Sequence, residues 1–322
     1  MATFVQFPHP GPEHCPESDD MPWNTGAHGR KFLISEGSYL ADNEVRQGEP
    51  VFWGEWEPPS HVERRWPRDG RLPRALHRPY WGRGIGQNTD PWVFGDRMRY
   101  SNCRQVRDER RPTSMQTLSP GSVICFGSKI DYEFCVDTVF VVAEAERWTP
   151  AESADLGEDE AFLACTAEQL AAGADARTPF TLYRGATFEN PVHGMYSFVP
   201  ALPADGEGPR FARPALRMPG LIGPGIAQNT WGSKRPLAVA EVREAWDTVR
   251  EQVFAAGLVL ATHLETPDRS ATPESAAGKG VGCAAVQTVA CAGTVTSAQE
   301  VRPRERCSDV GAPLPSTVGR LT

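Results

Sequence analysis

Short runs of apolar positions mark most of the predicted strands in this chain. Residues 4–7 alternate in polarity, and residues 51–53 are apolar. Residues 122–128 and 134–142 are rich in β-branched and aromatic side chains, and only residues 129–133 separate them, so we expect them to pair as antiparallel neighbours. Further strands are predicted at residues 180–185, 195–200 and 258–264, and residues 31–34 are expected to begin a short ordered element.

Helical periodicity is confined to two segments. One is the Ala-rich stretch around residues 158–172. The other opens after Pro236, ends at Gly257 and carries one apolar stripe at three- and four-residue spacing, made of Val239, Val242, Trp246, Val249 and Val253. The pattern therefore predicts an α+β fold with a mixed, mainly antiparallel sheet, flanking helices and long functional loops.

One of these loops has a near copy later in the chain. Residues 82–89 and residues 223–230 share the pattern Gly-x-Gly-Ile-x-Gln-Asn-Thr, with six of eight positions identical. We expect a single domain over residues 1–265, in which this repeat allows two pseudo-equivalent halves, 1–150 and 151–265. Residues 266–322 lose all periodicity, so a disordered tail is expected there.

Composition excludes several classes of protein. Of the 322 residues 40% are hydrophobic, yet no apolar run reaches the length of roughly 18 that a membrane span requires. Residues 1–8 lack the pattern of a signal peptide, so we expect a cytoplasmic protein. The 8 cysteines contain no Cys-x-x-Cys pair and the 7 histidines have no recognised ligand spacing, so neither a metal nor another cofactor is expected.

Positive charge is concentrated in one stretch of an acidic chain, residues 60–112, and the prolines in this stretch predict a long loop there. The net charge is −8, but residues 60–112 contain 13 Arg against 6 acidic residues. This stretch is either a solvated face or a phosphate-binding surface that would fit DNA. The candidate phosphate ligands are Arg64, Arg65, Arg68, Arg83 and Arg184.

The same loops supply side chains suited to a nucleobase. Flat rings can stack on a base, and side-chain amides can form paired hydrogen bonds with its edge. The candidate base-binding residues are Trp81, Gln87, Asn88, Trp92, Tyr183, Gln228 and Asn229.

Two carboxylates are the candidates for catalysis. Asp137 interrupts an otherwise apolar strand, where a buried charge needs a specific partner or a shifted pKa. Asp137 is therefore either a structural residue or a poised acid or base. Glu55 follows the apolar run at residues 51–53, and it is either functional or an ordinary surface acid.

Common catalytic motifs are absent: the sequence has no Walker motif, no Gly-x-Ser-x-Gly elbow and no His-Glu-x-x-His. Residues 183–185, Tyr-Arg-Gly, resemble the first catalytic strand of ADP-ribosyltransferases, but the downstream Ser-Thr-Ser and Glu-x-Glu motifs are missing.

A broader similarity spans about residues 1–265. The segments at residues 30–33, 53–57, 87–95, 136–142, 183–185 and 194–198 resemble uncharacterised bacterial proteins associated with DNA modification and phage defence. The resemblance implies DNA with modified bases as the partner.

These observations lead to a ranked expectation of function. The first hypothesis is a DNA glycosylase that excises a modified base, in which Asp137 and Glu55 stabilise a sugar cation or activate water. The alternatives are a non-catalytic reader of modified bases or nucleotides, and a nucleotide-using transferase built on Tyr183 and Arg184. The oligomeric state is not predicted.

Overall fold

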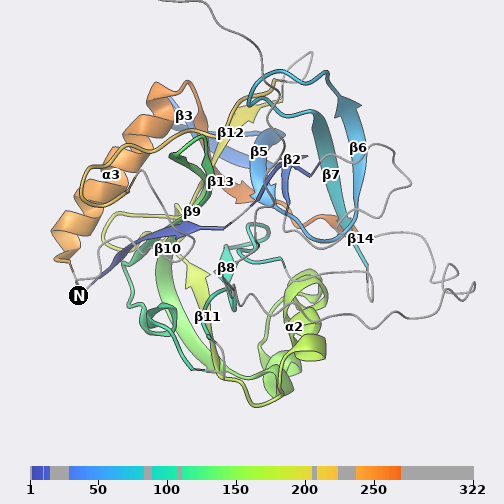
Figure 1. The fold of residues 1–322 in the computed structure, drawn as a ribbon, viewed down its shortest axis with the longest axis vertical. Coiled ribbons are helices and arrows are strands. Elements are labelled where there is room, and N and C mark those ends of the chain that lie inside the picture. Colours follow the sequence, from blue (N-terminus) through green and yellow to red (C-terminus); the bar gives the residue numbers. More distant parts are fainter. Residues whose placement is uncertain are drawn as a thin grey trace, which may run out of the picture. The chain divides into compact units, whose positions relative to one another are not determined.

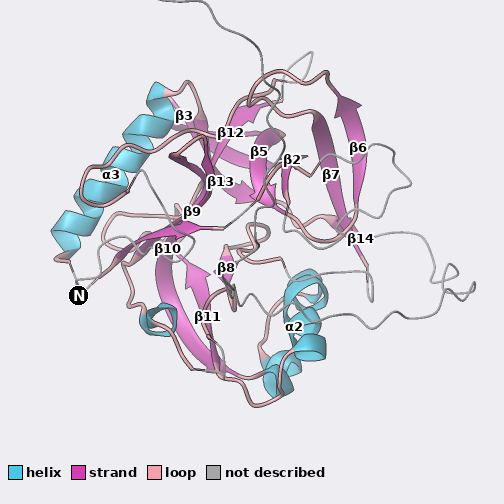
Figure 2. Ribbon diagram, viewed as in Figure 1, coloured by secondary structure: helices cyan, strands magenta, loops and turns pink. Residues whose placement is uncertain are grey.

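Strands dominate the chain and form two sheets (Figure 1; Figure 2). The computed structural model describes residues 2–9, 11–14, 29–82, 89–107, 111–204, 209–223 and 237–269. All of them belong to one compact unit that runs from Met1 to Cys291, and the second unit, Ala292–Thr322, lies outside the described residues.

The smaller sheet has five strands in the order β1-β9-β10-β11-β8. The pair β1/β9 is parallel and the other pairs are antiparallel, including the predicted neighbours β9 and β10. Their bounds are β1 Phe4–Pro8, β8 Arg99–Tyr100, β9 Val123–Ile130, β10 Glu133–Trp148 and β11 Phe180–Gly185.

The larger sheet has nine strands in the order β14-β7-β2-β5-β12-β13-β3-β4, with β6 paired to β7. Only β14/β7 and β2/β7 are parallel pairs. The bounds are β2 Arg30–Ile34, β3 Gly37–Ala41, β4 Glu44–Gly48, β5 Pro50–Glu55, β6 Ser60–Arg65, β7 Ala75–Trp81, β12 Val199–Pro203, β13 Val259–Leu264 and β14 Asp268–Arg269. The predicted α+β class with a mixed, mainly antiparallel sheet is confirmed, although strands outweigh helices.

Helices lie beside these sheets. One helical segment comprises α1 (Glu160–Phe162), a π-helical turn η4 (Leu163–Ala167) and α2 (Glu168–Gly173), and the longest helix is α3 (Val239–Ala255). The described part of the chain also contains two short 3₁₀ helices, η2 (Ser114–Thr117) and η3 (Pro150–Asp155). Within the described residues, none of the helices combines the length and the apolar character that crossing a membrane requires.

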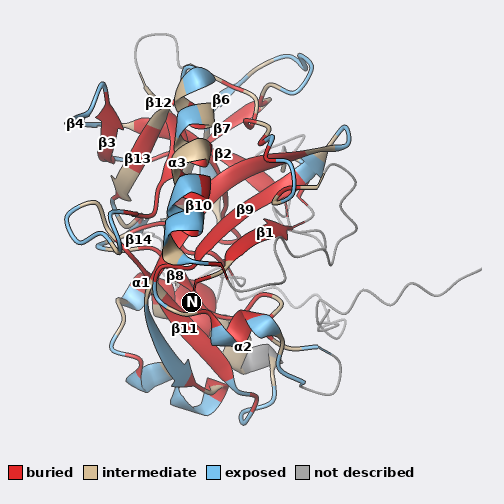
Figure 3. Cartoon of the chain, turned by 90° about the vertical axis from the view of Figure 1, so that its left-hand side faces the viewer, coloured by how far each residue is buried: buried red, intermediate tan, exposed pale blue. Residues whose placement is uncertain are grey.

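The predicted stripe of α3 faces the interior. Val242, Trp246, Val249 and Val253 are all at most 1% exposed, and they pack with side chains from both sheets. Gly257 follows the helix with φ of +76°, a conformation that glycine adopts at little cost at a helix C-terminus. Figure 3 shows the buried lengths of β1, β9 and β10 beside this helix.

Several predictions about chain organisation were wrong. The stretch expected to be a loop after residue 60 contains the antiparallel pair β6/β7. The segments 1–150 and 151–265, expected as possible pseudo-equivalent halves of one domain, are interleaved, because each sheet takes strands from both. Residues 268–269, expected in the tail, form β14 beside Tyr80 and Trp81 of β7.

Candidate functional site: a basic pocket in front of a buried ion cluster

Arg30 brings the two predicted carboxylates together. Its Nε donates to Asp137 Oδ2 at 2.7 Å, and its Nη1 donates to Glu55 Oε2 at 2.6 Å. Glu55 is the cross-strand partner of Arg30 in the larger sheet, whereas Asp137 belongs to β10 of the smaller sheet. All three side chains are at most 2% exposed, so this ion cluster ties the two sheets together.

A β-bulge positions Asp137. The register of β10 against β9 shifts between Val136 and Thr138, which leaves Asp137 as the additional residue. A bulge re-aims a side chain out of the regular alternation of a strand. Gly127 makes the bulge possible, because a Cβ there would lie only 2.2 Å from the carbonyl oxygen of Cys135. The interruption in the apolar pattern thus marks a charge that the backbone turns toward Arg30.

The charges in the cluster shift one another's ionisation. Burial alone would lower the pKa of Arg30, but the adjacent charges of Asp137 and Glu55 raise it above its ordinary value. Arg213 lies with Nη1 4.0 Å from Asp137 Oδ2, and burial lowers its pKa to about 10. Glu55 Oε2 also lies 3.7 Å from His9 Nδ1. Both arginines therefore stay cationic at neutral pH.

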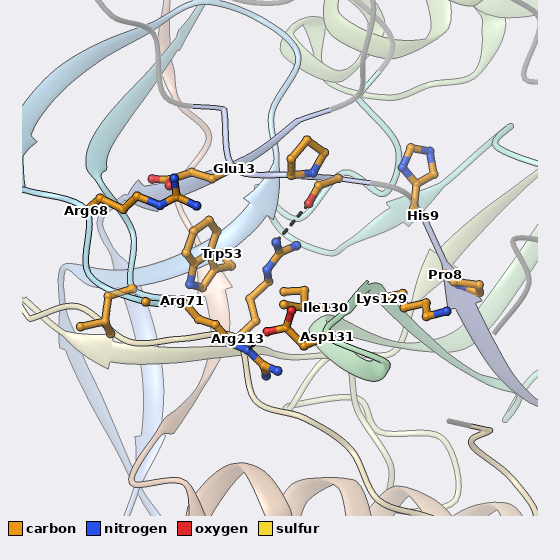
Figure 4. Close-up of a pocket in the computed structure, with 14 residues that line it drawn as sticks. Pro8, His9, Glu13, Trp53, Arg68, Arg71, Lys129, Ile130, Asp131 and Arg213 are labelled. Carbon is orange, nitrogen blue, oxygen red and sulfur yellow. Dashed lines mark hydrogen bonds and ion pairs between the residues drawn. The ribbon is translucent and has the colours of Figure 1, made fainter. Parts of the chain in front are cut away.

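A pocket of about 830 Å³ adjoins this cluster through His9 and Arg213. Figure 4 shows the side chains that line it. Four cationic side chains line it against two carboxylates, and His9 and Trp53 contribute rings. The guanidinium of Arg213 lies 4.9 Å from the ring centre of Trp53 and is fixed by bonds to Ser128 Oγ and the carbonyl of Gly11. The cations are Arg68, Arg71, Lys129 and Arg213, and the carboxylates are Glu13 and Asp131.

The predicted catalytic carboxylates do not line this pocket. Asp137 lies behind Arg213, and Glu55 lies behind His9, each one side chain away from the wall. Such carboxylates can orient the wall residues and balance their charge. Direct contact with a bound ligand would require the cluster to open.

The predicted phosphate ligands fall into two groups. Arg64, Arg65 and Arg68 are exposed on β6 and just after it, and Arg68 reaches the pocket. Arg184, by contrast, is engaged by acids: its Nε donates to Glu158 Oε1 at 2.6 Å, and Glu146 lies 2.8 Å from its Nη2.

Arg184 belongs to a network of ion pairs that links β8 and β11 to Glu158 and Asp159, which follow η3. Glu158 also accepts from Arg99, and Asp159 lies 3.0 Å from Arg99 Nη2. The prediction that Arg184 holds phosphate is therefore replaced by a structural role. Arg83 lies outside the described residues.

Two of the predicted base-binding rings belong to the core instead. Trp92 is fully buried, with Trp56, Phe94 and Phe162 around its ring. The hydroxyl of Tyr183, also fully buried, donates to the carbonyl of Met115 and accepts from the amide of Leu118. Neither ring has a face open to a base in this conformation.

The remaining base-binding candidates are Trp81 and the amides of the two loops. Trp81 is 6% exposed, with the guanidinium of Arg269 5.2 Å from its ring centre. Gln87, Asn88, Gln228 and Asn229 lie outside the described residues. The description of the chain resumes at Thr89, whose Oγ accepts a hydrogen bond from the backbone amide of Glu57 at 2.9 Å.

A second buried charge lies on the other face of β2. Lys31 is 1% exposed and its Nζ donates to the carbonyl of Pro58 at 3.0 Å. Burial lowers its pKa well below the ordinary value, although the charge of Glu57 opposes this. The nearby His77 is also buried, and its pKa is lowered to about 3 by burial and by the charge of Lys31.

The sequence identified the two carboxylates, but it did not identify the residues that surround them. Arg30 could have been noticed, since a charged pair, Arg30-Lys31, begins an apolar strand. No comparable signal marks His9, Lys129 or Arg213, which meet only through tertiary structure. Among the described residues, no group of three or more His, Cys, Asp or Glu side chains is arranged to hold a metal ion.

Comparison of the chain with models of protein families, with curated proteins and with solved structures found no match. The site must therefore be interpreted from its own chemistry.

Proposed function

We propose that this chain is a cytoplasmic, DNA-directed protein that holds a modified, unpaired nucleotide in the basic pocket. The observation that carries the proposal is the pocket wall, on which four cations outnumber two carboxylates beside the rings of Trp53 and His9. Guanidinium and ammonium groups bind phosphate oxygens, and such contacts hold a nucleic-acid strand in place. The reason for proposing a modified base is the sequence resemblance to proteins associated with DNA modification and phage defence.

Binding without chemistry is the form that this geometry supports best. A reader needs cations for phosphate and a shaped cavity for the base, and the pocket offers both. A carboxylate that contacts a sugar cation must reach the bound nucleotide, whereas the side chains of Glu55 and Asp137 are at most 2% exposed and share Arg30. This reverses the order of the first two hypotheses.

Base excision is the second candidate, because both carboxylates lie only one side chain behind the pocket wall. The reaction would be hydrolysis: the bond between C1′ and the base nitrogen breaks, water adds its hydroxyl to C1′, and a proton goes to the departing base. Asp137 would stabilise the developing positive charge on the sugar. The transferase hypothesis gains no support, since Tyr183 and Arg184 have structural partners.

The test is to incubate the full chain with modified and unmodified phage DNA, and to measure binding and abasic sites in the same samples. Preferential binding of modified DNA without abasic sites is the expected result for a reader. Abasic sites that disappear in Asp137→Asn, while binding persists, would establish excision. Equal affinity for modified and unmodified DNA together with no abasic sites would contradict both forms.

A further inference from the structure

The tip of the β9–β10 hairpin carries an aromatic ring that lies outside the hydrophobic core. Tyr132 is 78% exposed, and only one other large hydrophobic side chain among the described residues, Val45, is classed as exposed. Packing therefore does not explain a tyrosine at this position. A single exposed apolar side chain is ordinary on a protein surface, so the exposure of Tyr132 gains meaning only from the backbone and the charges beside it.

The backbone at the tip also favours residues other than tyrosine. Asp131 and Tyr132 form the two-residue connection between the strands, and their φ angles are 47° and 68°. Hairpin turns with positive φ at both central residues strongly prefer Asn-Gly or Asp-Gly, because a bulky side chain is strained there. Asp131 fits that preference and Tyr132 does not. Strain of this kind tends to occur where function requires it.

Ion pairs hold the turn at the rim of the basic pocket. Arg71 Nε donates to Asp131 Oδ2 at 2.7 Å, and Arg71 Nη1 donates to Glu133 Oε2 at 3.1 Å. Arg71, Lys129 and Asp131 all line the pocket, so Tyr132 directly follows a wall residue. The ammonium group of Lys129 lies 5.1 Å from the centre of the Tyr132 ring. The ring is thus displayed next to the cations.

We propose that Tyr132 is a stacking platform for a base of single-stranded DNA, beside the nucleotide whose phosphate the pocket cations hold. Aromatic side chains next to a cationic groove are how proteins hold single strands, since every base has a face on which a ring can stack. This inference rests on the proposed function, because it takes DNA as the ligand of the same pocket. It adds a contact outside the pocket that does not depend on the identity of the modified base.

The experiment measures binding of a fluorescent single-stranded oligothymidylate of about ten nucleotides to the full chain and its variants. Tyr132→Ala should weaken binding about tenfold, whereas Tyr132→Phe should stay within about twofold, because stacking needs the ring and not the hydroxyl. The dependence on salt should be the same in all three proteins, since no charge is lost. Val45→Ala, which trims the other exposed apolar side chain, is the matched control and should bind like the wild type.

A second probe isolates stacking from the backbone. An oligonucleotide of the same length made of abasic sites should bind the wild type and Tyr132→Ala equally. Tyr132→Asn should also lose affinity for oligothymidylate, while its thermal midpoint stays the same or rises, because asparagine tolerates positive φ. That combination separates a binding role from a structural one.

Three results would overturn the inference: undiminished binding by Tyr132→Ala, an equal loss in Tyr132→Phe, or no binding of the oligonucleotide by the wild type. Failure of the proposed function has a different signature. Modified and unmodified DNA would then bind equally well and no abasic sites would form, while the dependence of strand binding on Tyr132 persisted.

Discussion

His77 lies on β7 at 1% exposure, with its Nδ1 3.0 Å from Ser60 Oγ. Burial and the charge of Lys31 lower its pKa from 6.5 to about 3, so the folded protein keeps this ring neutral. The unfolded chain takes up a proton below pH 6.5 and the folded chain does not. Stability supplied by the neutral ring is therefore present above pH 6.5 and is lost as the pH falls.

We predict that His77 makes the protein sensitive to acid between about pH 6.5 and pH 3. Its contribution to the free energy of unfolding should fall by about 1.4 kcal/mol per pH unit in this range. Urea unfolding at several pH values should give a smaller pH dependence for His77→Gln than for the wild type. His14, whose pKa is lowered to about 4, acts in the same direction, and Asp90, whose pKa is raised to about 6, acts in the opposite one.

The comparison between wild type and His77→Gln isolates the residue from these other groups, because His14 and Asp90 are present in both proteins. Equal pH dependence in the two proteins would show that His77 does not titrate as described.

The sequence identified Asp137 and Glu55 because a carboxylate beside apolar residues is costly unless it is paired. It did not identify the pairing, since Arg30 precedes Asp137 by more than a hundred positions. The interrupted apolar pattern marked the charge of Asp137, but it did not predict the bulge that turns this side chain toward Arg30. A local sequence pattern can indicate that a residue is buried, but its interaction partner is determined by tertiary structure.

The β6/β7 ribbon shows a similar limit for secondary structure. Prolines and arginines made residues 60–81 look like a loop, yet the two strands pair over most of their length, with Pro79 of β7 placed opposite Ser60. Burial explains the misreading: β6 is mostly exposed, so its sequence lacks the apolar alternation by which half-buried strands are recognised.

The exposed arginines on and after β6 are predicted to contact DNA phosphates. Replacing Arg64, Arg65 and Arg68 with Ala should weaken DNA binding. The slope of log affinity against log salt should flatten by about one unit per lost contact. Measurements at several salt concentrations give that slope.

The matched control replaces Arg46, Arg177 and Arg243, which are exposed elsewhere on the surface. A slope in the triple variant that equals the wild-type slope would mean that these arginines form only a solvated face.

Across the whole molecule, the chain is interleaved more thoroughly than its sequence repeat indicated. The larger sheet contains the six early strands from β2 through β7 and the three late strands β12, β13 and β14. Segments from both ends of the described chain therefore build one sheet. The antiparallel pairing of β9 with β10 was predictable, because the two apolar segments are separated by only a short turn. The order of strands was not, since it depends on contacts between distant segments.

The end of the described chain gives a prediction about truncation. Removing residues 292–322, which form a separate unit, should leave the thermal midpoint nearly unchanged. Removing residues 266–322 should lower it by several degrees, at about 2–4 °C per kcal/mol, because β14 is lost from β7 and Arg269 no longer covers Trp81. Differential scanning calorimetry of both truncations tests this, and equal midpoints would show that β14 adds no stability.

The opposite orientations of Arg30 and Lys31 also protect the larger sheet against misalignment. Strand β2 has neighbours on both sides, and its apolar residues 32–34 would tolerate more than one alignment. A slip by one position would present Gly29 or Lys31 to Glu55 and Asp137, and would turn the guanidinium toward the carbonyl of Pro58. Either slip separates buried charges from the partners that they need. Arg30 and Lys31 therefore favour the observed alignment of β2 over alignments shifted by one residue.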